Sequence, residues 1–552
     1  MRRISIAISI AAIMVVACGQ TLAQERSNQR SNQGTSSNQG QQVPTTETGP
    51  DQRGQRPAMA PLPDTTAVQA TPPAKPLVPA EDVSVAEQLR DLIENKLQHH
   101  VSRQQDRAGI DAFYRNRDFA PLWVSDAKPL PRVQQAADFL RGVAADGLDP
   151  ADYPIPRFAD TDPARLAADE LAMTNSVMTF VRHASTGRVA FTRASASVYF
   201  DLKAPDPAQV LAQIAASGNV AGTLDSFSPQ HPHYKALKAE LATSRRSDPG
   251  RVDMIVANME RWRWLPRDLG RAHVMVNVPD YTLRLVDDGK AVWSTRIVVG
   301  KPGTYATPLL TETMKYITVN PTWNVPPSII RNEYLPALAR DPNALARVGL
   351  RLGRNGDGSL RVYQPPGERN ALGHIRFNFP NRFLVYQHDT PQKHLFDKTA
   401  RAFSHGCMRV QDPDRYAEVL LSVSQPEDGY TAKRIRSLYG ADERTINFKN
   451  PIPVHVTYQT MFVDDAGRWQ VRPDIYGLDK EIIGLLKGDK AVADIPVARN
   501  YSTSSAPVMA SAVSGRRQRA GADGFFGAAG GWGRPTYMQS WPAESRERHG
   551  VW

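Results

Sequence analysis

In the first half of the chain, apolar residues recur three or four positions apart, as in "VAEQLRDLIENKL", "VQQAADFLRGVAADGL" and "YKALKAELA". This spacing is typical of amphipathic helices, whose apolar side chains share one face. Asp162-Pro163 fits a helix start, because Asp caps a helix and Pro is tolerated in its first turn. We therefore predict a mostly helical domain over residues 83–250 and a connecting helix over 251–270.

From about Arg271 apolar and polar residues alternate, as in "AHVMVNVPDYTLRLVDDGKAVWSTRIVVG". Alternation is typical of strands, and "KYITVN", "FLVYQH" and "PVHVTY" follow the same pattern. We predict a β-rich domain over 271–459, interrupted over about 323–375 by an insert that "IIRNEYLPALARDPNALARVGLRL" makes helical. Residues 460–490 are expected to pack on this core as a C-terminal extension. The predicted fold class is multidomain α+β.

The two ends of the chain lack both periodicities. Residues 24–82 are rich in Gln, Asn, Ser, Thr and Pro, and residues 491–552 are rich in Ser, Ala, Gly and Arg. Such segments bury too little apolar surface to offset chain entropy. We therefore predict a disordered linker and a disordered tail.

Residues 1–23 have the pattern of a signal peptide, with a basic start and a short apolar run that ends in small residues. Cleavage after Ala23 would place the mature protein outside the cytoplasmic membrane. Lipoprotein processing at Cys18 is the alternative. No later apolar run approaches the length of a membrane span.

The chain is basic, with 67 Lys and Arg residues against 56 Asp and Glu residues and a formal net charge of +11. These residues form no recognisable nucleic-acid module, so no nucleic-acid partner is expected. A basic surface suits an anionic envelope polymer or a membrane surface, and a solvated basic face is an equally good explanation.

One stretch, "FLVYQHDTPQKHLFDKTARAFSHGCMRVQDPDRY", contains Cys407, one of only two cysteines in 552 residues. If Cys18 leaves with the signal peptide or is lipidated, Cys407 has no intramolecular disulfide partner. A lone thiol in an oxidising compartment is either buried and inert or chemically active.

The surroundings of Cys407 favour activity. His388 ends a predicted strand 19 positions earlier (407 − 388), and a polar, turn-rich loop lies between them. Such a loop can fold back and set the thiol beside the imidazole, which can take its proton and hold the thiolate. Gly406 allows a sharp turn there, and amide groups in the turn are candidates for an oxyanion hole.

Two other kinds of thiol–imidazole site compete with this interpretation. His388, His394, His405 and Cys407 could form a zinc cluster, but no C-x-x-C or H-x-x-x-H pair is present. A papain-like protease would carry its own cysteine signature and a cysteine that precedes the histidine, and both are missing. No metal or other cofactor is expected.

The histidine, the interval and the "SHGCMR" segment together resemble the signature of L,D-transpeptidases with a YkuD-type catalytic domain. "RWRWLP", "VNPTWNVPPSI", "YQPPGERNALG", "FNFPN" and "HDTPQKHLF" resemble the large periplasmic, YcbB-like branch of that family. Its members carry a helical scaffold domain, which "FYRNRDFAPLW" and "DGLDPADYPI" resemble, and a substrate-capping insert in the catalytic domain. The resemblance runs from about Val83 to Leu486.

The resemblance implies that Cys407 is the nucleophile and His388 its general base, with the carbonyl of Asp389 orienting the imidazole. Arg409 would bind a substrate carboxylate or, equally, form a structural ion pair. The other implied site residues support the loop and oxyanion region or line the site: Ser404, His405 and Gly406, and then Tyr386, Trp323 and His394.

The implied activity is acyl transfer from a peptidoglycan tetrapeptide stem, with release of D-alanine and formation of a 3→3 cross-link in the periplasm. An L,D-carboxypeptidase or cross-link hydrolase with the same acyl-enzyme, and a non-catalytic wall-binding scaffold, are the alternatives. Stem peptides are the expected partners, carbapenems the expected covalent inhibitors, and a monomer the expected state. Envelope proteins are candidate partners of the tails. The small peptidoglycan-binding module that many members insert after the scaffold is missing, which leaves targeting open.

Overall fold

The computed structural model describes residues 78–326, 329–354 and 360–488. The predicted signal peptide, most of the predicted linker and the predicted tail lie outside these residues. Within the described part of the chain, no helix is long and apolar enough to cross a membrane.

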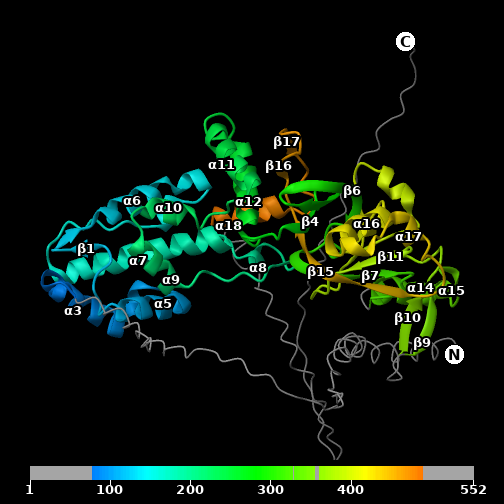
Figure 1. Cartoon of the computed structure of the whole chain (residues 1–552), viewed down its shortest axis with the longest axis horizontal. Coiled ribbons are helices and arrows are strands. Elements are labelled where there is room, and N and C mark those ends of the chain that lie inside the picture. The colour runs from blue at the N-terminus through cyan, green and yellow to red at the C-terminus, as the bar shows by residue number, and fades with distance from the viewer. Residues whose placement is uncertain (1–77, 327–328, 355–359, 489–552) are drawn as a thin grey trace, which may run out of the picture. The chain divides into compact units, whose positions relative to one another are not determined.

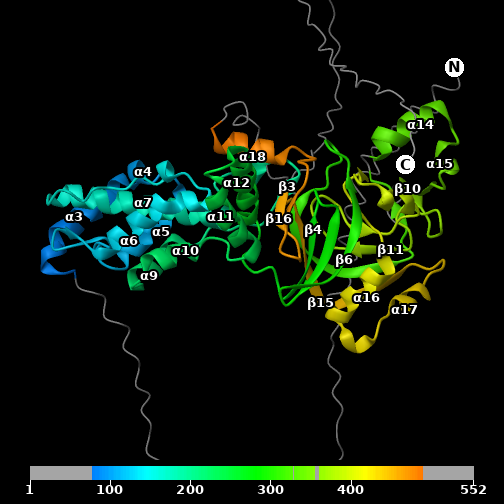
Figure 2. The same ribbon diagram turned by 90° about the horizontal axis from the view of Figure 1, so that it is seen from above.

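The first part of the chain is helical, as predicted, and its helices group around the long helix α7 (Pro163–Thr186) in Figures 1 and 2. Asp162 caps α7 by accepting a hydrogen bond from the amide of Arg165, and Pro163 opens the helix. Leu89, Trp123 and Val177 lie in the shared apolar core. The other elements are η1 (Ala80–Asp82), α3 (Val83–Asp91), η2 (Leu92–Lys96), α4 (Leu97–His100), α5 (Gln104–Arg115), β1 (Val124–Ser125), β2 (Lys128–Pro129), α6 (Pro131–Gly142), η3 (Val143–Asp146), η4 (Pro150–Asp152), α9 (Pro207–Ala216) and α10 (Val220–Asp225).

The β-rich part is a sheet with the strand order β11-β12-β14-β6-β5-β4-β15-β7-β3. An additional pairing between β11 and β7 closes the strands from β11 to β7 into a ring, and β13 pairs with β6. Its strands are β3 (Val198–Tyr199), β4 (Ala272–Asn277), β5 (Thr282–Asp287), β6 (Lys290–Gly300), β7 (Leu309–Val319), β11 (Ile375–Asn378), β12 (Gln387–His388), β13 (Ala402–Ser404), β14 (Met408–Val410) and β15 (Arg444–Thr457).

Helices that precede the sheet strands in sequence, and helices that follow them, complete the core of the sheet. Buried side chains of α12 and α16, such as Ile255 and Leu420, belong to the same apolar cluster as the strand residues Leu283 and Phe377. The helices concerned are α8 (Phe191–Ala194), α11 (Pro232–Ser244), α12 (Pro249–Arg263), α16 (Pro413–Ser424), α17 (Ala432–Arg436) and α18 (Leu478–Leu486), and the short η7 (Pro426–Asp428) follows α16.

The cluster also includes residues that the sequence assigned elsewhere. Val189 and Phe200 lie in the predicted scaffold range 83–250, yet they pack with the sheet, and β3 pairs with β7. The extension 460–490 forms β16 (Met461–Val463), β17 (Trp469–Val471) and α18. Met461 and Ile482 of the extension are buried in the sheet cluster. The domain boundaries themselves stay predictions.

The insert is more than the helical segment that its sequence predicts. A three-stranded sheet, β8-β10-β9, stands beside short helices, and Val325, Leu345 and Val362 belong to a small core of its own. Its elements are β8 (Trp323–Asn324), η5 (Ile330–Tyr334), α14 (Leu335–Arg340), α15 (Ala344–Arg347), β9 (Arg351–Arg354) and β10 (Leu360–Gln364). The strands escaped the sequence analysis because each is only two to five residues long.

Candidate active site

The imidazole lies at the end of β12, and the thiol of Cys407 directly precedes β14, the strand that runs parallel to β12. In this pair, Gln387 of β12 is opposite Met408 of β14, and His388 is opposite Arg409. Gln387 and Met408 are fully buried in the core. Because side chains alternate between the faces of a strand, His388 and Arg409 share the other face. Tyr386 and Cys407 directly precede the two strands, and Tyr386 contacts both groups: its ring lies 5.7 Å from that of His388, and its side chain is hydrogen-bonded to Cys407.

The imidazole of His388 is fixed in one orientation. Its Nδ1 donates a hydrogen bond of 2.5 Å to the carbonyl oxygen of Asp389, which leaves the lone pair of Nε2 free. Burial, and then the positive charges of Arg409 and Arg376, lower the pKa of His388 to about 3. A neutral imidazole with a free Nε2 can act as a proton acceptor.

The thiol of Cys407 is partly exposed and packs against the core. Burial raises its pKa to about 11, against the lowering effect of hydrogen bonds with Tyr386 and of the charges of Arg376 and Arg409. At pH 7 the thiol is protonated and His388 is neutral. The sequence suggested that the imidazole holds a preformed thiolate. The structure instead favours the neutral forms of both groups, because burial disfavours an imidazolium and a thiolate.

The loop before Cys407 is held by the backbone conformation of Gly406 and by a buried hydroxyl. Gly406 has φ of +111°, a conformation that side-chain-bearing residues rarely adopt. The hydroxyl of Thr307 donates to the carbonyl of Gly406 at 2.9 Å and accepts from the amide of Gly300 at 2.8 Å. Gly300 has no room for a Cβ, which would come within 1.9 Å of the carbonyl oxygen of Tyr305.

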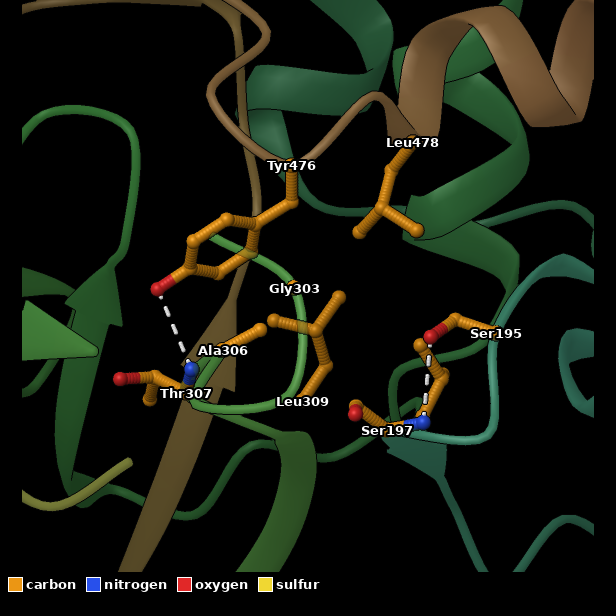
Figure 3. A pocket seen from close by; sticks show the side chains of 9 residues that line it. Ser195, Ser197, Gly303, Ala306, Thr307, Leu309, Tyr476 and Leu478 are labelled. Carbon is orange, nitrogen blue, oxygen red and sulfur yellow. Dashed lines mark hydrogen bonds between the residues drawn. The ribbon is translucent and has the colours of Figure 1, made fainter. Parts of the chain in front are cut away.

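Through Tyr476, the C-terminal extension contacts Gly300 and Thr307, the residues that hold the loop before Cys407. The Tyr476 hydroxyl donates to the carbonyl of Gly300 at 2.7 Å and accepts from the amide of Thr307 at 3.1 Å, the second contact being drawn in Figure 3. A cavity of about 160 Å³ lies beside these residues, between Ser195, Leu309 and Leu478. Its lining does not include Cys407, so it lies behind the loop rather than at the thiol.

The insert meets the same loop at His405. Nε2 of His405 contacts the carboxylate of Glu333 in η5, and the ring of His405 stands at 4.5 Å from that of Tyr305. Asn332, also in η5, donates to the hydroxyl of Tyr305 at 3.4 Å. A hydrogen bond from Trp323 of β8 to Tyr386 brings the insert to the strand that carries His388.

The remaining predicted site residues lie in different places. Ser404 is buried in β13, where its carbonyl accepts from the amide of Lys301. The Asp389 carboxylate accepts from Lys393 at 2.6 Å and from the amide of His374 at 2.9 Å. His394 is exposed on η6 (Lys393–Asp397).

Sequence reasoning missed Arg376, Glu333 and Tyr305. Arg376 alternates with buried residues in "HIRFNF", so its strand position was visible, but its neighbours across the sheet were not. For Glu333 and Tyr305 we find no sequence signal. Among the described residues, no group of three His, Cys, Asp or Glu side chains is placed to hold a metal ion.

Two family models match the chain. One, described as a scaffold domain, matches residues 108–241, and the other, described as an L,D-transpeptidase catalytic domain (YkuD), matches residues 271–435. The second range contains His388 and Cys407 with the strands that carry them.

Proteins that are similar to this chain are also named L,D-transpeptidases. A Haemophilus influenzae protein, provisionally named an L,D-transpeptidase, is 24% identical over 432 residues, which cover 73% of this chain and 85% of the relative. Solved L,D-transpeptidases from Mycobacterium smegmatis and Mycobacterium tuberculosis are 15% and 12% identical, and each alignment covers 34% of this chain. These alignments span 58% and 61% of the solved chains, less than two thirds, with a TM-score of 0.18, too low to carry an argument. On these matches, the chain carries a scaffold domain followed by an L,D-transpeptidase catalytic domain of the YkuD family.

Proposed function

We propose that this protein is a periplasmic peptidoglycan L,D-transpeptidase that forms 3→3 cross-links by cysteine acyl transfer. The observation that supports the proposal is the parallel pairing of β12 with β14, which sets His388 opposite Arg409, two residues after Cys407, while Tyr386 contacts both His388 and Cys407. A neutral imidazole with a free Nε2 and a partly exposed cysteine on the neighbouring segment are the groups that nucleophilic catalysis needs.

In the first half-reaction, Sγ of Cys407 bonds to the carbonyl carbon of the third stem residue while Nε2 of His388 takes the thiol proton. The carbon–nitrogen bond to the terminal D-alanine then breaks, and His388 gives the proton to the departing amine. Backbone amides around Gly406 and Cys407 are the proposed donors to the oxyanion.

In the second half-reaction, an amine of a neighbouring stem attacks the thioester carbonyl and loses its proton to His388. The carbon–sulfur bond breaks, and His388 returns the proton to the thiolate of Cys407. A strained β-lactam carbonyl is open to the same attack, so we expect carbapenems to form a covalent adduct at Cys407.

The other proposed roles follow from the contacts. Ser404, His405 and Gly406 support the nucleophile loop, and Tyr386 and Trp323 line the site beside the thiol. The lining role of His394 stays a prediction. Stem peptides are the proposed partners, and the monomeric state and the role of the tails stay predictions.

The test is incubation of the purified protein with tetrapeptide muropeptides and identification of the products by mass spectrometry. We expect 3→3 dimers and free D-alanine from the wild type, none from Cys407→Ala, and near-normal turnover from the control Arg434→Gln, which changes an exposed side chain on α17. The melting temperature of Cys407→Ala should stay close to that of the wild type. Substantial turnover in Cys407→Ala would remove Cys407 from the mechanism. Tripeptide without dimers would identify a carboxypeptidase, and cleavage of preformed dimers a hydrolase.

A further inference from the structure

The general-base candidate stands between two arginines on adjacent strands. Arg376 of β11 is directly opposite His388 of β12, which is in turn opposite Arg409 of β14. Directly opposite residues point to the same face, and neighbouring strands are about 4.8 Å apart. The three side chains therefore form a row, Arg376–His388–Arg409.

Neither guanidinium in this row has an acidic partner. Arg376 stands over the ring of Tyr386 at 5.4 Å, and its buried Nε has no hydrogen-bond partner. Arg409 donates to the side-chain oxygen of Gln392 at 2.6 Å, and its buried Nε is also unpartnered. Among the described residues, neither arginine forms an ion pair within 4.0 Å.

Two fully buried arginines elsewhere in the molecule have carboxylate partners. The buried Arg263 pairs with Glu260 at 2.8 Å, and the buried Arg261 pairs with Asp479 at 2.6 Å. Lys393, which adjoins the row, pairs with Asp389 at 2.6 Å. A half-buried guanidinium without a counter-charge lowers stability, and the cost is recovered when an anion binds.

We propose that Arg376 and Arg409 form a clamp for the free carboxylate of the residue that leaves the donor stem. The inference rests on the proposed acyl transfer, in which that carboxylate is two bonds beyond the scissile nitrogen. Guanidinium groups on both sides of His388 would hold the leaving residue with its nitrogen at the base that protonates it. The planar fork of Arg suits a carboxylate. The clamp selects donors that end directly after the scissile bond over longer or amidated ones.

The first experiment needs no turnover. Cys407 is alkylated with iodoacetate, which carries a carboxylate, and with neutral iodoacetamide, and the ratio of the two rates is measured by peptide mass spectrometry. Because the ratio is taken within each variant, a change in the reactivity of the thiol cancels. We expect a ratio above that of free glutathione, and at least a threefold fall, roughly, in Arg376→Gln and in Arg409→Gln at low ionic strength.

Arg434→Gln is the matched control, since Arg434 also stands over a tyrosine ring, that of Tyr430 at 4.3 Å, but on exposed α17. Its ratio should equal that of the wild type. A wild-type ratio that persists in both Arg376→Gln and Arg409→Gln, with normal iodoacetamide rates showing folded sites, would overturn the clamp.

The second experiment compares donor stems that end in a carboxylate or in a carboxamide. The wild type should prefer the carboxylate donor by at least about tenfold in kcat/KM. In Arg376→Gln, kcat/KM should fall for the carboxylate donor and stay unchanged for the carboxamide donor, so that most of the preference is lost. Equal preference in the wild type and in Arg376→Gln would also overturn the clamp. If no transfer occurs at all, the proposed function fails, while the alkylation ratio still decides on the clamp.

Discussion

At the scale of residues, the site is built so that neither partner of the thiol–imidazole pair is charged before substrate arrives. The pKa of His388, lowered to about 3, leaves the imidazole neutral well below pH 5. The pKa of Cys407, raised to about 11, keeps the thiol protonated beyond pH 8. Charge then appears only during attack, when the oxyanion donors and the substrate carboxylate can compensate it.

This arrangement predicts the pH dependence of thiol reactivity. Alkylation of Cys407 by iodoacetamide should rise about tenfold per pH unit between pH 6 and 9, because the thiolate fraction grows in that way below the thiol pKa. Rates measured by mass spectrometry across this range provide the test. A rate that is flat between pH 6 and 8 would instead show a preformed thiolate–imidazolium pair.

In His388→Ala, acylation by a stem peptide should fall by roughly 10²- to 10⁴-fold.

At the scale of elements, the insert and the nucleophile loop are joined by the pair of Glu333 and His405. This contact places η5 next to the residue that precedes Gly406 and Cys407. An insert held there would keep water from the thioester and give the acceptor amine time to attack. The ratio of cross-linking to hydrolysis should therefore depend on the pair.

We predict that Glu333→Gln shifts products from dimers toward hydrolysed tripeptide by roughly threefold to tenfold, with a smaller effect on carbapenem acylation. The matched control is Glu368→Gln, because Glu368 also pairs with a histidine of the same region, His374 at 3.5 Å, but is 90% exposed. Product analysis of both variants provides the measurement. An unchanged ratio of cross-linked to hydrolysed product in Glu333→Gln would show that the pair of Glu333 and His405 does not contribute to water exclusion.

Helix α7 carries a buried carboxylate that ties the helical part together. Glu170 accepts hydrogen bonds from the amides of Leu122 and Trp123 and from the hydroxyl of Tyr114. Burial nevertheless raises the pKa of Glu170 to about 7 from an ordinary 4.5. The folded state therefore holds this proton more tightly than the unfolded state does.

The consequence is a stability contribution that is full below about pH 4.5 and is lost as pH rises through 7. It amounts to about 3 kcal/mol at most. Glu170→Gln should remove this part of the pH dependence, seen as a smaller difference between the free energies of urea unfolding at pH 5 and pH 7.5. Glu240→Gln, at the partly exposed partner of Arg251, should keep the wild-type difference. Identical differences in the wild type and Glu170→Gln would contradict the raised pKa.

Periodicity was enough to predict the helical part and the β-rich part, because each contains a face that must be buried, and it predicted the helices of the insert but not its three short strands. The "SHGC" motif was enough to single out Cys407, and strand pattern with loop length singled out His388. The place of Arg376 depends on the pairing of β11 with β12, and that of Glu333 on how the insert folds back. Both are contacts between residues distant in sequence, which a local pattern does not encode.

At the scale of the whole molecule, the loop before Cys407 depends on the C-terminal extension. Tyr476 bonds to Gly300 and Thr307, and Thr307 bonds to Gly406. We predict that Tyr476→Phe lowers the free energy of unfolding by about 1–3 kcal/mol, since it leaves a buried amide and carbonyl unpaired. It should also slow acylation of Cys407. Tyr430→Phe, which keeps its ring contact with Arg434, is the control and should leave both quantities unchanged. Unaltered acylation in a destabilised Tyr476→Phe would show that the loop holds its shape alone.

The bond between Tyr476 and Gly300 joins residues that are 176 positions apart. A chain emerges from the ribosome with its N-terminus first. Cys407 is therefore made before the residue that secures its loop, and the loop gains this support only after Tyr476 has been added. A product truncated before Tyr476 would carry both Cys407 and His388 and still lack the support of the loop between them. The order of synthesis thus places the support of the site after its reactive residues.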